Sequence, residues 1–207
     1  VIALTAMAGL FVLAVIVSLA GKLSGESRRG YESVSSPEKL GSLFRFLGSR
    51  EARYSLAVSV TLHGAFGLVL GYLPILQVRS GMSMGEIGLF GAVGTNLIGV
   101  LSTLLAGYIL VKIRGWSLLL QLGIGTGLFM VLSAAFYTLS EDVTAVILFG
   151  SILFFLSYFY FVPFKAIVLT FCQGRWAASQ AALLSSCDLI VGTLFAAMAG
   201  LVTTHLG

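Results

Sequence analysis

The stretch VTAVILFGSILFFLSYFYFVPF, residues Val143–Phe164, contains no Asp, Glu, Lys or Arg. An α-helix needs about 20 consecutive apolar residues to cross a hydrocarbon core about 30 Å thick, and this stretch is long enough. A comparable window with a single acid, Asp188, runs from Ala177 to Leu201. Further charge-free windows of similar length are Val1–Gly21, Tyr54–Val78, Ile87–Val111 and Gly115–Ser140.

These windows predict an all-α fold, a polytopic membrane helix bundle with six transmembrane helices. The composition agrees, because 58% of the 207 residues are hydrophobic and 10% are charged, whereas a soluble domain carries about 25% charged residues. This composition argues against a cytosolic enzyme. The strict alternation that marks the strands of a membrane β-barrel is absent from these windows. We expect the helices at residues 1–20, 54–78, 85–111, 116–139, 143–172 and 177–201.

The distribution of basic residues predicts the orientation of these helices. Residues 21–53 contain most of the Lys and Arg residues, and the six-helix count places Lys112, Arg114 and Arg175 on the same side. Because Lys and Arg concentrate in cytoplasmic loops, this side is predicted to be cytoplasmic. We expect an integral, multi-pass membrane protein, with the lipid bilayer as a partner.

Residues 21–53 are predicted to form a cytoplasmic loop between the first helix and a C-terminal bundle over residues 54–207. Within this loop, Leu40, Leu43, Phe44 and Leu47 recur at helical spacing after the capping pattern of Ser35–Glu38. The pattern predicts a short helix lying in the membrane interface. A disordered tether is the alternative, and it suits residues 25–36 better.

Three ionisable residues fall within predicted transmembrane helices: His63, Lys165 and Asp188. Such groups are costly in a bilayer and usually face a bundle interior or a water-filled cavity, so each is a candidate for a substrate or proton pathway. Asn96 is the strongest neutral candidate. Lys165 could instead snorkel to the interface, His63 could bond a backbone carbonyl, and Asn96 could hold two helices together. Asp188 is too short to snorkel and must be protonated, hydrated or paired.

These candidates lie in stripes of small and polar residues at helical spacing, so four helices could line a pathway. The stripes are Ser59, His63, Gly67 and Gly71; Gly88, Ala92, Asn96, Gly99 and Thr103; Ser151, Tyr158, Lys165 and Cys172; and Ala181, Ser185, Asp188 and Gly192. Tyr158 could stack on an organic solute, or it could face lipid or pack against a neighbouring helix. Pro163 frees the carbonyl of Phe159 and is expected to kink its helix.

Motifs for other classes of function are absent from the sequence. The glycines of Gly123–Gly127 lack the following Lys of a phosphate-binding loop, and no HExxH pattern or Ser/His/Asp constellation suggests catalysis. Cys172 and Cys187 lie in apolar segments and build neither a disulfide framework nor a metal site. The basic loop is too short and too mixed in charge to indicate nucleic-acid binding. We expect no catalytic residues, cofactor, metal or nucleic-acid partner.

Six helices, with a long basic loop after the first, resemble helices six to eleven of a major facilitator superfamily transporter. The loop Gly107–Gly115 (GYILVKIRG) is similar to the superfamily's G-x-x-x-D-[RK]-x-G loop, with Val111 in place of the acid. Cys172–Ser185 (CQGRWAASQAALLS) is similar to the C-x-x-R-x-x-A-[ST]-Q-x-A-L-L-S stretch of AmpG-type muropeptide permeases and of acetyl-CoA-transporter-like and siderophore-uptake carriers. The resemblance implies a gating role for three basic residues, Lys112, Arg114 and Arg175, and a location in the bacterial cytoplasmic (inner) membrane.

The resemblance and the titratable groups together lead us to expect a secondary transporter that moves an organic solute by alternating access, with proton-coupled uptake. Asp188 or His63 would exchange the proton, and Lys165 would meet an anionic group of the substrate. An N-terminal half would complete the transporter. The main alternative is a non-transporting membrane sensor or scaffold. An intramembrane enzyme is a third possibility, but no nucleophile and base can be named for it.

Overall fold

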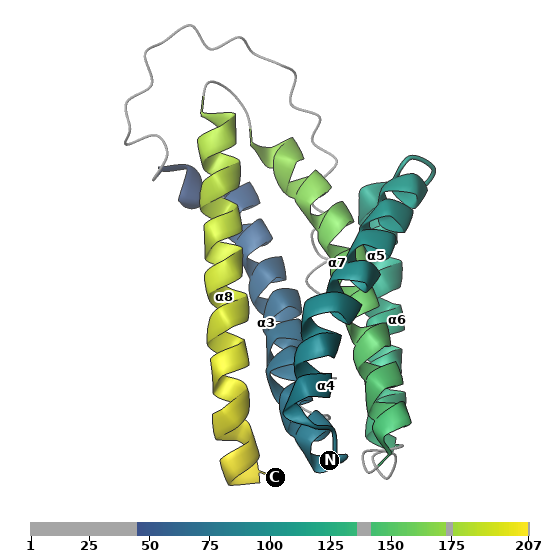
Figure 1. The fold of residues 1–207 in the computed structure, drawn as a ribbon. Helices are drawn as coiled ribbons and strands as arrows, with labels where there is room; N and C mark the ends of the chain where they lie inside the picture. Colours follow the sequence, from purple (N-terminus) through teal and green to yellow (C-terminus); the bar gives the residue numbers. More distant parts are fainter. Residues whose placement is uncertain (1–44, 136–141, 173–175, 207) are drawn as a thin grey trace, which may run out of the picture.

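The computed structural model describes residues 45–135, 142–172 and 176–206, and all regular secondary structure in this part of the chain is helical. Figure 1 shows the arrangement of these helices. In chain order they are α3 (Arg50–Arg79), α4 (Met84–Leu89), the π-helical turn η1 (Phe90–Gly94), α5 (Thr95–Leu110), α6 (Gly115–Ala135), α7 (Val143–Phe171) and α8 (Ala177–Leu206).

Four of the described helical segments are long and apolar enough to cross a membrane: Arg50–Arg79, Met84–Leu110, Val143–Phe171 and Ala177–Leu201. The second of these joins α4, η1 and α5 end to end. They match the predicted helices at 54–78, 85–111, 143–172 and 177–201, which confirms the all-α class. α6 covers the start of the predicted helix at 116–139, and its apolar part, Ser117–Leu132, is shorter.

Some predictions fall outside the described residues. They include the first transmembrane helix at 1–20, the end of the helix predicted at 116–139, and nearly all of the interfacial helix. Of the interfacial helix, residues 45–47 are described and are helical, and a turn at Gly48 leads from them into α3.

Polar side chains set the starts of the helices. The Oγ atom of Ser49 accepts the N–H of Ala52 at 3.1 Å and caps α3. Ser83 and Glu86 form a reciprocal capping box at the start of α4, and the carboxylate of Asp142 accepts the N–H of Thr144 at 2.9 Å before α7. Each cap satisfies an N–H group that the helix itself leaves without a partner. The turn between α3 and α4 needs Gly81, whose φ of 90° is strained for other residues.

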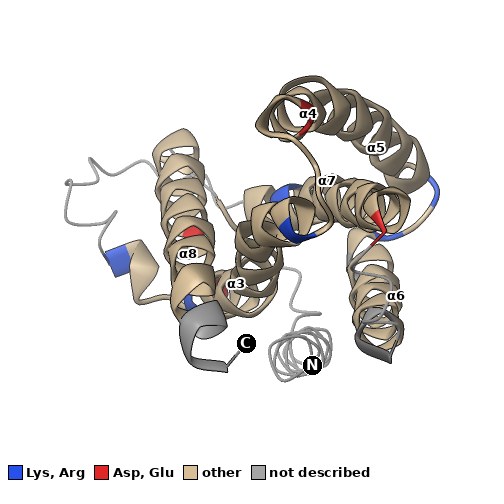
Figure 2. Cartoon of the chain, turned by 60° about the horizontal axis from the view of Figure 1, so that its bottom comes forward, with Lys and Arg blue, Asp and Glu red and all other residues tan. Residues whose placement is uncertain are grey.

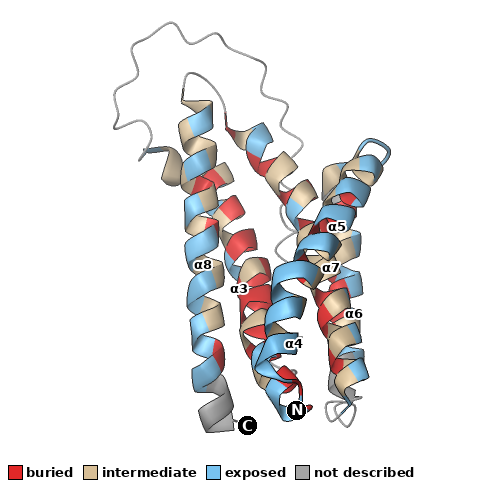
Figure 3. Cartoon of the chain, viewed as in Figure 1, coloured by how far each residue is buried: buried red, intermediate tan, exposed pale blue. Residues whose placement is uncertain are grey.

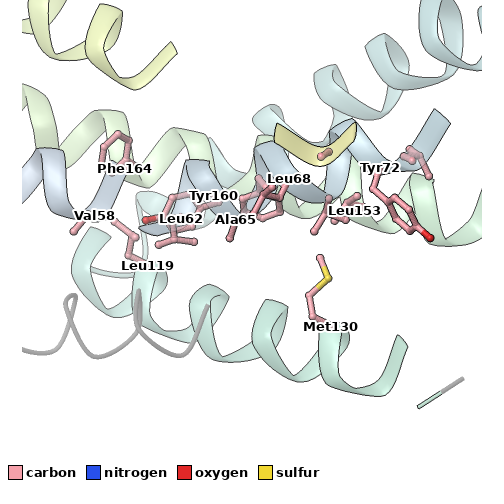
Figure 4. Close-up of a cluster of buried hydrophobic side chains, with 14 of the residues drawn as sticks. Val58, Leu62, Ala65, Leu68, Tyr72, Leu119, Met130, Leu153, Tyr160 and Phe164 are labelled. Carbon is pink, nitrogen blue, oxygen red and sulfur yellow. The ribbon is translucent and has the colours of Figure 1, made fainter. Parts of the chain in front are cut away.

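α3 is the central helix of the described bundle. In its most apolar 18-residue window 61% of the residues are buried, against 11% in that of α8. Figure 3 shows the same contrast, with buried residues along α3 and exposed residues over much of α4, α5 and α8. The core lies between α3, α6 and α7 (Figure 4), where Leu62 and Ala65 of α3 meet Leu119 of α6 and Tyr160 of α7.

α3 and α8 approach each other closely because glycines line their contact. A Cβ atom at Gly67 would overlap the carbonyl oxygen of Gly192, and one at Gly71 would lie 2.9 Å from the Cβ of Ala199. Such small residues let transmembrane helices pack backbone against backbone. Part of the stripe that the sequence assigned to a pathway, Gly67 and Gly71, is therefore used for helix packing.

A second group of helices consists of α5, α6 and α7. α5 packs on α7, where the ring of Tyr158 lies against Gly99 and the hydroxyl of Ser102 donates to the carbonyl of Phe155 at 2.6 Å. α6 joins the same region through Leu118, which clusters with Ala106 of α5 and Phe159 of α7. Few charged residues interrupt these helices (Figure 2), as a bilayer environment requires.

A cluster of ionisable side chains between α3, α7 and α8

Asp188, on α8, is the centre of a polar cluster to which three helices contribute. Its side chain is 6% exposed. Its Oδ1 atom accepts a hydrogen bond from the hydroxyl of Ser59 on α3, and its Oδ2 atom lies 3.0 Å from the ammonium of Lys165 on α7. Asp188 is therefore paired rather than isolated, as its mid-helix position demanded.

His63 approaches the same carboxylate from α3. Its Nδ1 atom lies 2.6 Å from Oδ1 of Asp188, which is ion-pair distance, but the ring is not oriented for a hydrogen bond from Nδ1. The imidazole is surrounded by the aromatic rings of Tyr160, Phe161 and Phe164, with the ring centroid of Phe164 nearest at 5.1 Å. Protonation of His63 would thus place a positive charge directly beside the carboxylate.

Lys165 points across to α8. Its ammonium donates to Oγ of Ser185 at 3.1 Å and to Oδ2 of Asp188, and it lies 5.0 Å from the ring centroid of Phe161 and 5.5 Å from that of Phe164. This geometry differs from the snorkelling alternative, in which the ammonium would extend toward the interface. The carboxylate and the two aromatic faces hold the charge within the bundle instead.

The cluster joins α7 to α8, two helices that otherwise share little surface. α3 and α8 form one closely packed pair, whereas α7 and α8 make few contacts outside the cluster. With His63 neutral, the positive charge of Lys165 and the negative charge of Asp188 cancel. Removal of either one would leave the other charge buried without its partner, which is costly in an apolar setting.

The structure does not bring Asn96 or Tyr158 into this cluster. Asn96 is exposed on α5, and its Nδ2 atom donates to the carbonyl of Ala92 in its own helical segment at 2.6 Å. This intrahelical bond satisfies the amide without a partner helix. The sequence left three alternatives for Tyr158: stacking on a solute, facing lipid or packing against a neighbouring helix. Its ring packs on Gly99 of α5, which agrees with the third.

Pro163 is fully buried, and α7 continues through it from Val143 to Phe171.

Lys112 and Arg114 lie in the short turn between α5 and α6, where the ammonium of Lys112 donates to the Tyr108 hydroxyl at 2.7 Å. The third residue that the resemblance assigned to gating, Arg175, lies outside the described residues.

Sequence reasoning found His63, Lys165 and Asp188 but missed some of their neighbours. Ser59 and Ser185 were in the predicted stripes, although not as hydrogen-bond partners of the charged groups. Phe164 could not be predicted as a neighbour of the cluster, because an aromatic residue in a membrane helix ordinarily faces lipid or packs against another helix. The π-helical turn η1 was also missed, as its sequence continues the apolar helix pattern.

Within the described residues no group of three or more His, Cys, Asp or Glu side chains could hold a metal ion. What the cluster offers is one carboxylate, one ammonium and one imidazole in contact, a set that can exchange a proton or bind an oppositely charged group. Comparison of the chain with protein-family models, with curated proteins and with solved structures finds no match.

Proposed function

We propose that this chain is part of a secondary active transporter of the major facilitator superfamily, in which six helices of this chain and a second half enclose a midplane site. The observation that carries the proposal is the cluster of His63, Lys165 and Asp188, contributed by three separate helices. Charged groups inside apolar helices are retained at a cost, and substrate and ion pathways are the commonest reason for them.

The depth of the cluster supports the proposal. Asp188 lies 11 residues from the start of α8 at Ala177, or about 16 Å at 1.5 Å per residue. His63 lies 13 residues from the start of α3 at Arg50, or about 20 Å. Both positions are near the middle of a hydrocarbon core about 30 Å thick. Carriers that work by alternating access hold their substrate at this depth.

The arrangement of the helices also supports a carrier. The α3–α8 pair is held by backbone contact through Gly67, whereas α7 meets α8 mainly through Lys165. A polar contact between two helices that share little other surface can be broken and remade when a solute or a proton binds, so it can tie solute binding to helix movement. On this basis we propose proton-coupled uptake, and from the resemblance to AmpG-type permeases we propose a bacterial inner membrane as its location.

The test is uptake of solutes by the protein reconstituted in liposomes. Accumulation of radiolabelled muropeptide, ferric siderophore and acetyl-CoA is measured with an inward proton gradient. The measurement is repeated after a protonophore has been added to collapse the gradient. We expect gradient-dependent accumulation of one of the three, and its loss in Asp188→Asn. Ser186→Ala is the matched control, because Ser186 is exposed on the same helix and its hydroxyl donates to the Ala182 carbonyl of that helix. No accumulation of any of the three would contradict the proposal.

A non-transporting sensor or scaffold is the second candidate, and one observation favours it. Asp188 is already satisfied within the protein by Ser59 and Lys165, so the cluster could serve only to hold three helices together. Normal uptake in a variant that loses stability, such as Lys165→Ala, would show that the cluster is structural and that the solute binds elsewhere.

A further inference from the structure

The three charged or titratable groups of the cluster are not equally accessible. The side chains of Lys165 and His63 are 20% and 16% exposed, whereas that of Asp188 is 6% exposed. A solute that reaches the cluster therefore meets the ammonium and the imidazole first, with the carboxylate behind them. This order favours an anionic group on the solute and disfavours a cationic one.

Lys165 has capacity for such a group. An ammonium can donate three hydrogen bonds, and the structure shows Lys165 donating to two acceptors, Ser185 and Asp188. Beside it, the ring of Phe161 is 43% exposed and lies within reach of both Lys165 and His63, at 5.0 Å and 6.3 Å. An apolar or aromatic body next to the anionic group would find a matching surface there.

The charges then determine what must accompany the anion. With His63 neutral, Lys165 and Asp188 cancel, so a bound monoanion would give the cluster a net charge of −1 inside apolar helices. Uptake of one proton by the imidazole restores neutrality, and the new charge forms 2.6 Å from Oδ1 of Asp188. Histidine is the side chain whose ordinary proton exchange falls in the physiological range.

The groups that face His63 support this assignment. From α8 it is faced by Asp188, and from α7 by Tyr160, whose ring centroid lies 6.0 Å away, and by the Phe161 and Phe164 rings, over which the Lys165 ammonium lies. Tyr160 is buried and has no described partner for its hydroxyl. Each carboxylate oxygen of Asp188 already has a donor, Ser59 for Oδ1 and Lys165 for Oδ2, whereas Nδ1 of His63 has no hydrogen-bond partner among the described residues.

We propose that the cluster binds one singly charged anionic group of an organic solute, next to an apolar or aromatic body, together with one proton, the anionic group on Lys165 and the proton on His63. The inference rests on the proposed transport function and adds a substrate class and a fixed stoichiometry. One anion and one proton enter, the imidazole becomes an imidazolium, and no other bond is formed or broken. The loaded and the empty cluster are both neutral.

The experiment measures binding rather than transport. The purified protein in detergent is titrated calorimetrically with benzenesulfonate, a permanent monoanion, in two buffers of different ionisation enthalpy, which yields the number of protons taken up per anion. We expect about one proton per anion at neutral to mildly alkaline pH. The affinity should then fall about tenfold per pH unit in the range where one proton is taken up. Benzenesulfonamide, which has the same ring and no charge, should bind at least tenfold more weakly.

Two variants assign the roles. His63→Gln should bind the anion with no proton uptake and no pH dependence, and Lys165→Gln should lose anion binding. Ser186→Ala, the control on α8, should behave like the parent protein. Absence of benzenesulfonate binding, equal binding of the sulfonamide, or proton uptake that persists in His63→Gln would each overturn the inference. Binding with one proton but no solute uptake in liposomes would refute transport and leave the anion site standing.

Discussion

The close approach of α8 to Gly67 of α3 allows a sharp test of how these two helices pack. In Gly67→Ala the added methyl group would overlap the carbonyl oxygen of Gly192 and would lie 3.2 Å and 3.3 Å from the carbonyl carbon and Cα of the same residue. The obstruction is backbone of a long helix, so no side chain can rotate away. The two helices would have to separate, which would also pull Asp188 away from Ser59 and His63.

The size of the effect follows from two opposing terms. Overpacking a close contact costs about 1–3 kcal/mol, and the rigid obstacle places Gly67→Ala in the upper half of that range. Replacing a helical glycine by alanine returns about 0.5–1 kcal/mol. We therefore expect the free energy of unfolding to fall by about 1–2 kcal/mol.

The matched control lies on the other side of the same contact. A Cβ atom at Gly192 would meet only the carbonyl oxygen of His63, at 4.0 Å, which is ordinary van der Waals distance. Gly192→Ala should therefore gain about 0.5–1 kcal/mol from helix propensity alone. Reversible unfolding by SDS in mixed micelles, followed by circular dichroism, measures both variants. Equal changes in the two variants, or an unchanged Gly67→Ala, would refute the backbone-contact geometry.

Three further predictions use the same unfolding measurement. Asp188→Ala should lower the free energy of unfolding by about 3 kcal/mol, because it leaves Lys165 without its partner, and a second change to Lys165→Met should restore most of that loss. Gly81→Ala should cost about 1–2 kcal/mol, because φ is 90° there. Ser102→Ala should cost about 0.6–1.7 kcal/mol, because its fully buried hydroxyl donates to the Phe155 carbonyl at 2.6 Å.

Each of these has a control and a contrary outcome. Gly85→Ala, at an open helical position near Gly81, should be neutral or stabilising, and equal losses at both positions would argue against backbone strain at Gly81. Ser186→Ala, the control for Ser102→Ala, should change the free energy of unfolding by less than about 0.5 kcal/mol. If it lowers the free energy of unfolding as much as Ser102→Ala does, the bond from Ser102 to α7 does not stabilise the protein more than a bond within one helix. A double variant as unstable as Asp188→Ala would show that the two charges are not coupled.

Much of the helical architecture could be predicted from the sequence. Inside a bilayer every backbone polar group must be satisfied within the segment, so a long charge-free window has few alternatives to a helix. The helix that begins at Met84 was predicted to begin one residue later, and its start is set by the local capping pair Ser83 and Glu86. The π-helical turn at Phe90–Gly94 could not be predicted, because the residues there suit an ordinary helix equally well.

The candidate site was predictable as a set of residues but not as a cluster. His63, Lys165 and Asp188 stand out because ionisable groups are rare and costly in apolar helices. Asn96 stood out as the strongest neutral polar residue, yet its amide bonds to the carbonyl of Ala92 in its own helical segment and stays exposed. Local sequence does not distinguish a polar group that satisfies itself within its helix from one that needs a neighbour.

The sequence by itself determined the all-α fold class, the approximate spans of the helices and the ionisable residues that stand out within them. These features depend on local hydrophobicity and charge. Only the tertiary structure decided which helices meet. The backbone contact at Gly67 brings α8 against α3, and that approach places Asp188 beside Ser59 and His63 within reach of Lys165. Which helices pack together depends on how the surfaces of segments far apart in the chain fit each other. The sequence of any one helix therefore does not determine its neighbour.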